Sequence, residues 1–217
     1  MRKFNLFLKR TIDLTGATLL LILLIIIPVF IVIPIAIRLT SKGPAIFTQD
    51  RTGKDGKIFK IYKFRTMLIP EESLDENGEM MLPEQRITKV GQILRKTSLD
   101  ELAQIFNILN GTMSIVGPRP TLPYQMERYD ERQMGRHAMR PGITGWAQVN
   151  GRNDLTWGEK IEYDLEYIEN FNIWFDIKIL FRTVAVVLKM DGVEFTKNDA
   201  INAKESIPEK EKETVND

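Results

Sequence analysis

An uncharged stretch of 21 residues, residues 17–37, constrains this chain more than any other feature of its sequence. About 20 apolar residues are enough to cross the hydrocarbon core of a bilayer as a helix. A secretory signal peptide does not fit, because the stretch exceeds the roughly 7–15 apolar residues of a signal core and no small-x-small cleavage motif follows it. We therefore expect residues 1–40 to form a membrane-inserted segment that stays attached.

The flanking charges and one proline bear on the geometry of this segment. Lys and Arg are abundant both before and after it, as they are in loops that stay in the cytoplasm. A helix that enters, breaks and returns keeps both flanks on one side. Pro28, near the middle, favours such a break because it lacks an N–H and its ring clashes with the preceding turn. A kinked spanning helix is the alternative, since membrane helices tolerate proline, and these features leave both geometries open.

The composition limits which catalytic groups the chain can use and which binding partners fit it. A net charge of +1 conceals 12 Lys/Arg and 3 Asp/Glu in residues 1–69, against 18 and 26 in residues 70–217. A segment that is both basic and apolar favours an anionic membrane surface over nucleic acid. Cysteine is absent and His137 is the single histidine, which excludes thiol chemistry and multi-histidine metal sites. Carboxylates, Lys and Arg must therefore carry most of the chemistry.

The rest of the chain predicts one α/β domain, mostly helical with a short β element, over residues 41–196. Apolar and basic residues alternate over residues 58–65, which is typical of a half-buried strand. The last predicted helix could pack in the core, which we expect, or lie in a membrane interface. Residues 197–217 are charged and almost free of aromatic residues, so we expect a disordered tail. Helices are predicted at residues 92–109, with an interruption near Thr97, 159–170 and 175–189.

The segment Ser98-Leu99-Asp100-Glu101 precedes apolar residues at helical spacing and has two interpretations. As a capping box, Ser98 and Glu101 would satisfy the first N–H groups of a helix, and Asp100 would complement its dipole. As a reactive site, Asp100 would lie where a helix N-terminus binds phosphate and keeps a carboxylate ionised, so that it could attack phosphorus. The motif alone favours the structural interpretation.

Attack on a phosphate needs cations, and the chain offers several. Arg119 lies between Pro118 and Pro120, which fix the backbone and pre-organise a bidentate contact to an anion. Its alternative role is that of a surface charge or a loop brace. Mg²⁺ would suit paired carboxylates together with phosphate oxygens. The candidate cations are Lys63, Arg95, Lys96, Arg119, Arg140 and Arg152.

Five motifs, in order along the chain, resemble the bacterial sugar transferase family, and more closely its small monotopic polyprenyl-phosphate phosphoglycosyl transferases. The resemblance covers roughly residues 5–192. The motifs are Phe-Thr-Gln-Asp-Arg at 47–51, Tyr-Lys-Phe-Arg-Thr-Met at 62–67, Ser-Leu-Asp-Glu-Leu at 98–102, Ser-Ile-Val-Gly-Pro-Arg-Pro at 114–120 and Arg-Pro-Gly-Ile-Thr-Gly-Trp-Ala-Gln-Val-Asn-Gly-Arg at 140–152.

The resemblance implies an enzyme of the bacterial inner membrane with its catalytic domain on the cytoplasmic face. Such an enzyme moves a sugar 1-phosphate from a UDP-sugar to undecaprenyl phosphate and releases UMP. This is the first membrane step of a glycoconjugate pathway such as capsule or exopolysaccharide synthesis, so downstream glycosyltransferases are possible partners. The resemblance also implies a re-entrant helix broken at a Ser-Pro pair. Here the pair is Ile27-Pro28, which keeps the proline but lacks the serine.

The resemblance further assigns roles to single residues. It implies that Asp100 forms a covalent phosphosugar intermediate and lies at the Mg²⁺ site, with Glu101 as its catalytic partner. Lys63, Arg95, Arg119 and Arg152 are then expected to bind the phosphates or the uridine. The alternative to an enzyme is a membrane-anchored interaction protein of glycan assembly that has no catalytic activity. In such a protein the acidic pair would be only a helix cap.

Overall fold

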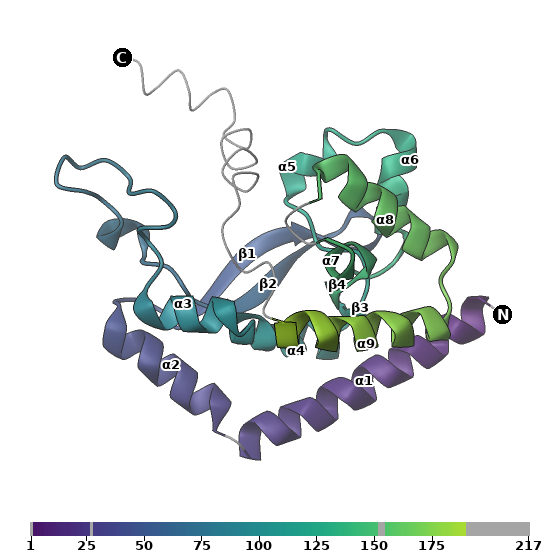
Figure 1. The fold of residues 1–217 in the computed structure, drawn as a ribbon, viewed down its shortest axis with the longest axis horizontal. Helices are drawn as coiled ribbons and strands as arrows, with labels where there is room; N and C mark the ends of the chain where they lie inside the picture. Colours follow the sequence, from purple (N-terminus) through teal and green to yellow (C-terminus); the bar gives the residue numbers. More distant parts are fainter. Residues whose placement is uncertain (1, 27, 152–154, 190–217) are drawn as a thin grey trace.

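The computed structural model describes residues 2–26, 28–151 and 155–189. Helices α1 (Arg2–Ile26) and α2 (Val29–Thr40) form an open V at the base of the molecule (Figure 1), with a bend of 62° between them. Pro28 lies in the break as the N-cap residue of α2, whereas Pro34 is accommodated inside α2. No single described helix is long and apolar enough to cross a membrane, but α1 and α2 together have the length and composition to do so.

Above the V lies a body built on two small sheets. Strands β1 (Ile46–Thr52) and β2 (Ile58–Phe64) form an antiparallel hairpin, which confirms the strand predicted at residues 58–65. Strands β3 (Ser114–Val116) and β4 (Gly142–Thr144) pair in parallel. We expected a turning loop at β4, but the backbones of Gly142 and Gly117 approach so closely that a side chain would not fit, and glycine thereby permits a short ladder.

Helices pack against both sheets, so the α/β prediction is confirmed (Figure 1). The three predicted helices are present, and the interruption near Thr97 separates α3 from the next helical turn. The longer elements are α3 (Lys89–Lys96), the 3₁₀ helix η3 (Leu99–Gln104), α4 (Ile105–Leu109), α8 (Trp157–Glu169) and α9 (Ile173–Lys189). The shorter ones are η1 (Lys54–Gly56), η2 (Pro70–Glu72), α5 (Pro123–Met126), α6 (Glu131–Met134), η4 (Gly135–Ala138) and α7 (Trp146–Val149). The predicted tail, residues 197–217, lies outside the described residues.

Helix α9 is amphipathic. Ile179 is fully buried in the core beside Tyr167 of α8, whereas Trp174 and Phe181 are 79% and 75% exposed. One face of α9 therefore packs in the core, as expected, and another face is free of the body.

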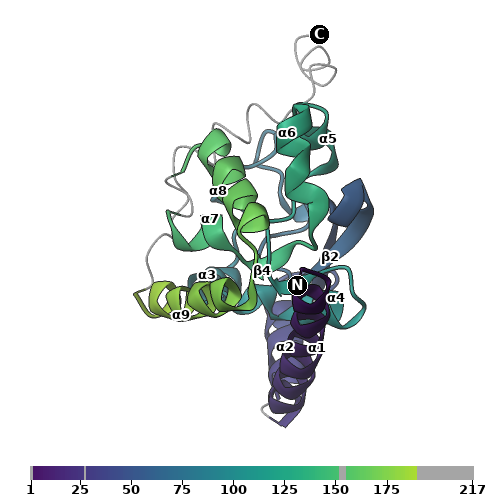
Figure 2. The ribbon, with the colours of Figure 1, turned by 90° about the vertical axis from the view of Figure 1, so that its right-hand side faces the viewer.

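Buried polar contacts fasten α1 to the body. Lys9 Nζ donates to Asp176 Oδ2 of α9 over 2.7 Å, and both side chains are buried. Asp13 accepts from the Ser114 hydroxyl and from the backbone N–H of Ile115, at 2.8 and 3.0 Å. Figure 2 shows the V of α1 and α2 projecting from the base of the body, so the first half of α1 is fixed while the apex extends away.

Candidate active site

The predicted acidic pair lies at a sharp break between α3 and η3. Ser98 has a left-handed backbone with φ of 56°, and its side chain makes no capping bond. An N-cap residue normally has an extended backbone, so the capping-box interpretation of this segment is wrong. Left-handed conformations of residues other than glycine are strained and cluster at functional sites. The break places Asp100 and Glu101 in the first turn of η3, facing β2.

Glu101 is engaged by Lys63 from β2 instead of by a helix cap. Lys63 Nζ donates to Glu101 Oε1 over 2.7 Å, and the two side chains are 22% and 21% exposed. The residues are 38 positions apart in the chain. This pair brings a cation beside Asp100 and ties η3 to the sheet.

Asp100 lies in an environment of opposing influences. The pKa of its carboxyl is raised above the ordinary value, first by burial; the charge of Lys63 lowers it, Glu101 raises it and Arg95 lowers it. Arg95 is itself oriented by a bond from its Nε to Thr66 Oγ1 of 2.9 Å. The partly desolvated carboxylate is therefore held beside two cations, as a nucleophile for an anionic substrate requires.

These groups line one cavity of about 1220 Å³. Ligand pockets usually measure about 300–1,000 Å³, so the cavity is large enough for more than one substrate. Five of the predicted site residues meet there: Lys63, Arg95, Asp100, Glu101 and Arg119.

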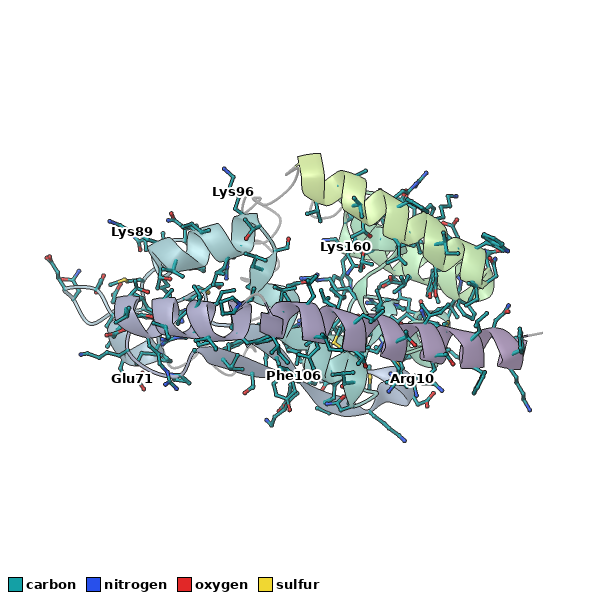
Figure 3. All side chains as sticks on the ribbon, turned by 90° about the horizontal axis from the view of Figure 1, so that it is seen from below. Arg10, Glu71, Lys89, Lys96, Phe106 and Lys160 are labelled. Atoms are coloured by element: carbon teal, nitrogen blue, oxygen red, sulfur yellow. The ribbon has the colours of Figure 1, made fainter. Side chains whose placement is uncertain are left out.

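Two of the other predicted cations lie away from the cavity. Arg140 Nε donates to the carbonyl of Gly111 over 2.8 Å and braces that turn. Lys96 is exposed and points away from the body (Figure 3). Arg152 lies outside the described residues.

The sequence interpretation missed further cavity residues. Arg51, at the end of β1, lines the cavity, and burial together with the charge of Arg119 lowers its pKa to about 10, so it remains charged at neutral pH. Its place in the motif at residues 47–51 was the available signal. The buried ion pair of Arg136 with Asp164 also borders the cavity, and Arg136 donates to the backbone carbonyl of Arg119. Nothing in the local sequence marks that pair.

His137, the single histidine, lies in a buried position beside Arg136. Its side chain is buried, and burial together with the neighbouring Arg136 charge lowers its pKa to about 4. The imidazole is therefore neutral at physiological pH.

The site could hold Mg²⁺ only if the substrate phosphates supplied some of the ligands. Among residues 2–26, 28–151 and 155–189, no group of three or more His, Cys, Asp or Glu side chains could hold a metal ion. Magnesium commonly takes one or two carboxylates and completes its shell with substrate phosphates and water. Asp100 and Glu101 can supply that number.

Known proteins share the sequence of this chain over most of its length. Residues 4–190 match the bacterial sugar transferase family, and the chain belongs to that family. It is 44% identical to the uncharacterized sugar transferase EpsL of Bacillus subtilis over 191 residues, which are 88% of this chain and 92% of that one. The resemblance to the bacterial sugar transferase family and the prediction of a transferase are thus confirmed, and the non-catalytic alternative is set aside.

Longer relatives carry names that specify substrates. The UDP-glucose:undecaprenyl-phosphate glucose-1-phosphate transferase of Escherichia coli is 50% identical over 188 residues, 83% of this chain and 40% of that protein. The undecaprenyl-phosphate galactose phosphotransferase of Salmonella typhimurium is 40% identical over 205 residues, 86% of this chain and 41% of that protein. The chain thus spans less than half the length of these two relatives.

Proposed function

We propose that this protein transfers a sugar 1-phosphate from a UDP-sugar to undecaprenyl phosphate and releases UMP. The observation that carries the proposal is the placement of Asp100 and Glu101 in one cavity with Lys63, Arg95 and Arg119. The names of the Escherichia coli and Salmonella relatives support the choice of donor and acceptor.

The proposed reaction has two displacements at one phosphorus atom. A carboxylate oxygen of Asp100 attacks the β-phosphorus of the UDP-sugar, the bond from that phosphorus to the bridging oxygen breaks, and UMP leaves. A phosphate oxygen of the lipid then attacks the same phosphorus. The bond to Asp100 breaks, the carboxylate is restored and the lipid diphosphosugar is formed, ready for downstream glycosyltransferases.

The cations of the cavity neutralise the phosphates during both steps. Lys63 and Arg95 lie at the acidic pair, while Arg51 and Arg119 extend the positive charge along the cavity. Arg152 is a further proposed phosphate or uridine ligand. Mg²⁺, held by Asp100 with Glu101 beside it, would add charge neutralisation at the transferred phosphoryl group.

The proposed setting is the cytoplasmic face of the bacterial inner membrane, with α1 and α2 as a re-entrant hairpin over residues 1–40 and catalysis in residues 41–196. The bend of 62° at Pro28 and the exposed apolar side chains on both arms support this geometry. A lipid phosphate and a soluble nucleotide sugar can then meet at the headgroup plane.

A trapping experiment tests the proposed function. The purified protein is mixed with UDP-glucose or UDP-galactose labelled at the β-phosphate, quenched rapidly and analysed for protein-bound label and UMP. Wild-type protein should trap label without lipid, and Asp100→Asn should trap none. A lack of label and of UMP with every UDP-sugar in a broad panel would refute the proposal.

A further inference from the structure

The cavity continues past the acidic pair to a wall that a nucleotide sugar has no reason to contact. Helix α1 contributes Gly16, Ala17 and Leu20, which share one helical face because Leu20 follows the other two by four and three positions. Helix α9 contributes Leu180, Thr183, Val186 and Val187. These seven residues define the α1–α9 groove.

The α1–α9 groove is apolar. Within the described part of these two helices, every side chain that lines the cavity is uncharged. The single hydroxyl, that of Thr183, is satisfied by the carbonyl of Ile179 and the hydroxyl of Thr144, at 2.8 and 2.7 Å. Ile108 of α4 and Ile115 of β3 line the same cavity. Hydrocarbon is therefore the chemistry that this wall can bind.

Helices α1 and α9 diverge from one shared contact. The ion pair of Lys9 with Asp176 joins α1 and α9 near their N-terminal ends, and both helices run away from it while they separate (Figures 1 and 2). The part of α1 beyond Leu20 carries the rest of the long apolar stretch. The groove therefore leads from the acidic pair towards the helices proposed to enter the membrane.

We propose that the α1–α9 groove binds the first isoprene units of the polyprenyl phosphate acceptor. This inference rests on the proposed function. The cavity has cations at Lys63 and Arg95 and an apolar wall in continuity with them, which matches a ligand with a phosphate at one end and a hydrocarbon chain at the other. The cavity volume, above the usual range for one small ligand, leaves room for this chain beside the donor site.

Two matched pairs of variants test the groove. Val186→Trp and Leu20→Trp fill it from opposite helices. Val184→Trp and Leu19→Trp place the same side chain on exposed positions, 58% and 63% accessible, outside the cavity lining. The KM for undecaprenyl phosphate is measured in detergent. We expect a rise of at least tenfold in the groove variants and less than twofold in the controls.

A second assay separates the groove from the donor site. Exchange of labelled UMP into the UDP-sugar needs no lipid and reports on the donor half of the reaction. An unchanged acceptor KM in both groove variants, or an equal rise in the controls, would overturn the proposal that the groove binds the acceptor. The proposed function would still stand if the wild-type protein catalysed the exchange. Loss of exchange in both groove variants would place these residues in the donor site and also overturn the inference. Absence of exchange in wild-type protein would refute the proposed function itself.

Discussion

Lys63→Met should change both the catalytic rate and its pH dependence. Lys63 is the largest influence that keeps the pKa of Asp100 down, against the effects of burial and of Glu101. An opposite charge close to a carboxyl stabilises its ionised form. Removing Lys63 should therefore raise the pKa of Asp100 further and shift the acid limb of the rate profile to higher pH.

The same substitution also has a cost in stability. Exposed ion pairs are worth about 0.2–1 kcal/mol, whereas breaking a buried pair costs about 3–5 kcal/mol. Lys63 and Glu101 are 22% and 21% exposed, so we expect a loss of roughly 1–2 kcal/mol in the free energy of unfolding. This loss leaves the protein folded, and the lower activity can then be assigned to the site.

The control comes from the same strand. Lys60 Nζ lies 3.1 Å from Asp50 Oδ1, with side chains that are 64% and 54% exposed. Lys60→Met should leave the rate, its pH profile and the denaturant midpoint nearly unchanged. The assay is UMP release between pH 5 and pH 9 in detergent, with urea denaturation of the same samples. A Lys63→Met profile that overlays the wild type, or an equal effect of Lys60→Met, would refute the electrostatic role of Lys63.

Three further predictions concern the nucleophile, the buried histidine and the membrane segment. Asp100→Asn should lower UMP release by at least a thousandfold with an unchanged unfolding midpoint, and a variant that kept more than roughly a tenth of wild-type activity would exclude covalent catalysis. EDTA should stop the wild-type reaction, and added Mg²⁺ should restore it. His137 has a folded pKa of about 4, below the unfolded value of about 6.5. Because the unfolded chain binds more protons between these two values, the free energy of unfolding should fall as the pH drops from about 6.5 to about 4. His137→Gln should flatten this pH dependence, measured as the urea midpoint. In the cysteine-free chain, Lys3→Cys and Lys54→Cys should both be protected from an impermeant thiol reagent in intact cells, and labelling at position 3 alone would establish a spanning helix.

The resemblance to the family selected the five residues that share the cavity, whereas local patterns predicted elements of the fold. Alternation located β2, and helical spacing located α8 and α9. These signals succeed because each reflects an interaction within a few residues of chain. The prediction at Ser98 failed for the complementary reason: the spacing of a capping box was present, but the partner of Glu101 is 38 residues away on another element.

Long-range contacts between charged groups were beyond the reach of sequence patterns. Arg136 and Asp164 are 28 residues apart, and Lys9 and Asp176 are 167 residues apart. Burial of a charge is tolerable only with a partner, so each pair fixes the elements that carry it. The sequence around one partner does not predict the other partner, because a lone Lys or Asp in a helix is normally a solvent-exposed residue.

These long-range contacts also qualify the role of Pro28 in holding the bend. Arg65, after β2, donates to the backbone carbonyls of Ser41 and Lys42 at the end of α2, while Lys9 and Asp13 fasten the start of α1. A spanning helix would have to export one of these anchored ends. Exporting the start of α1 would break the buried Lys9–Asp176 pair, and breaking a buried ion pair typically costs about 3–5 kcal/mol. The proline removes one N–H and adds a ring clash, about 3 kcal/mol against helix continuity. The contacts of the body with both arms therefore oppose the spanning form at least as strongly as the proline does, which is why the absence of the serine from the Ile27-Pro28 pair is compatible with a stable break.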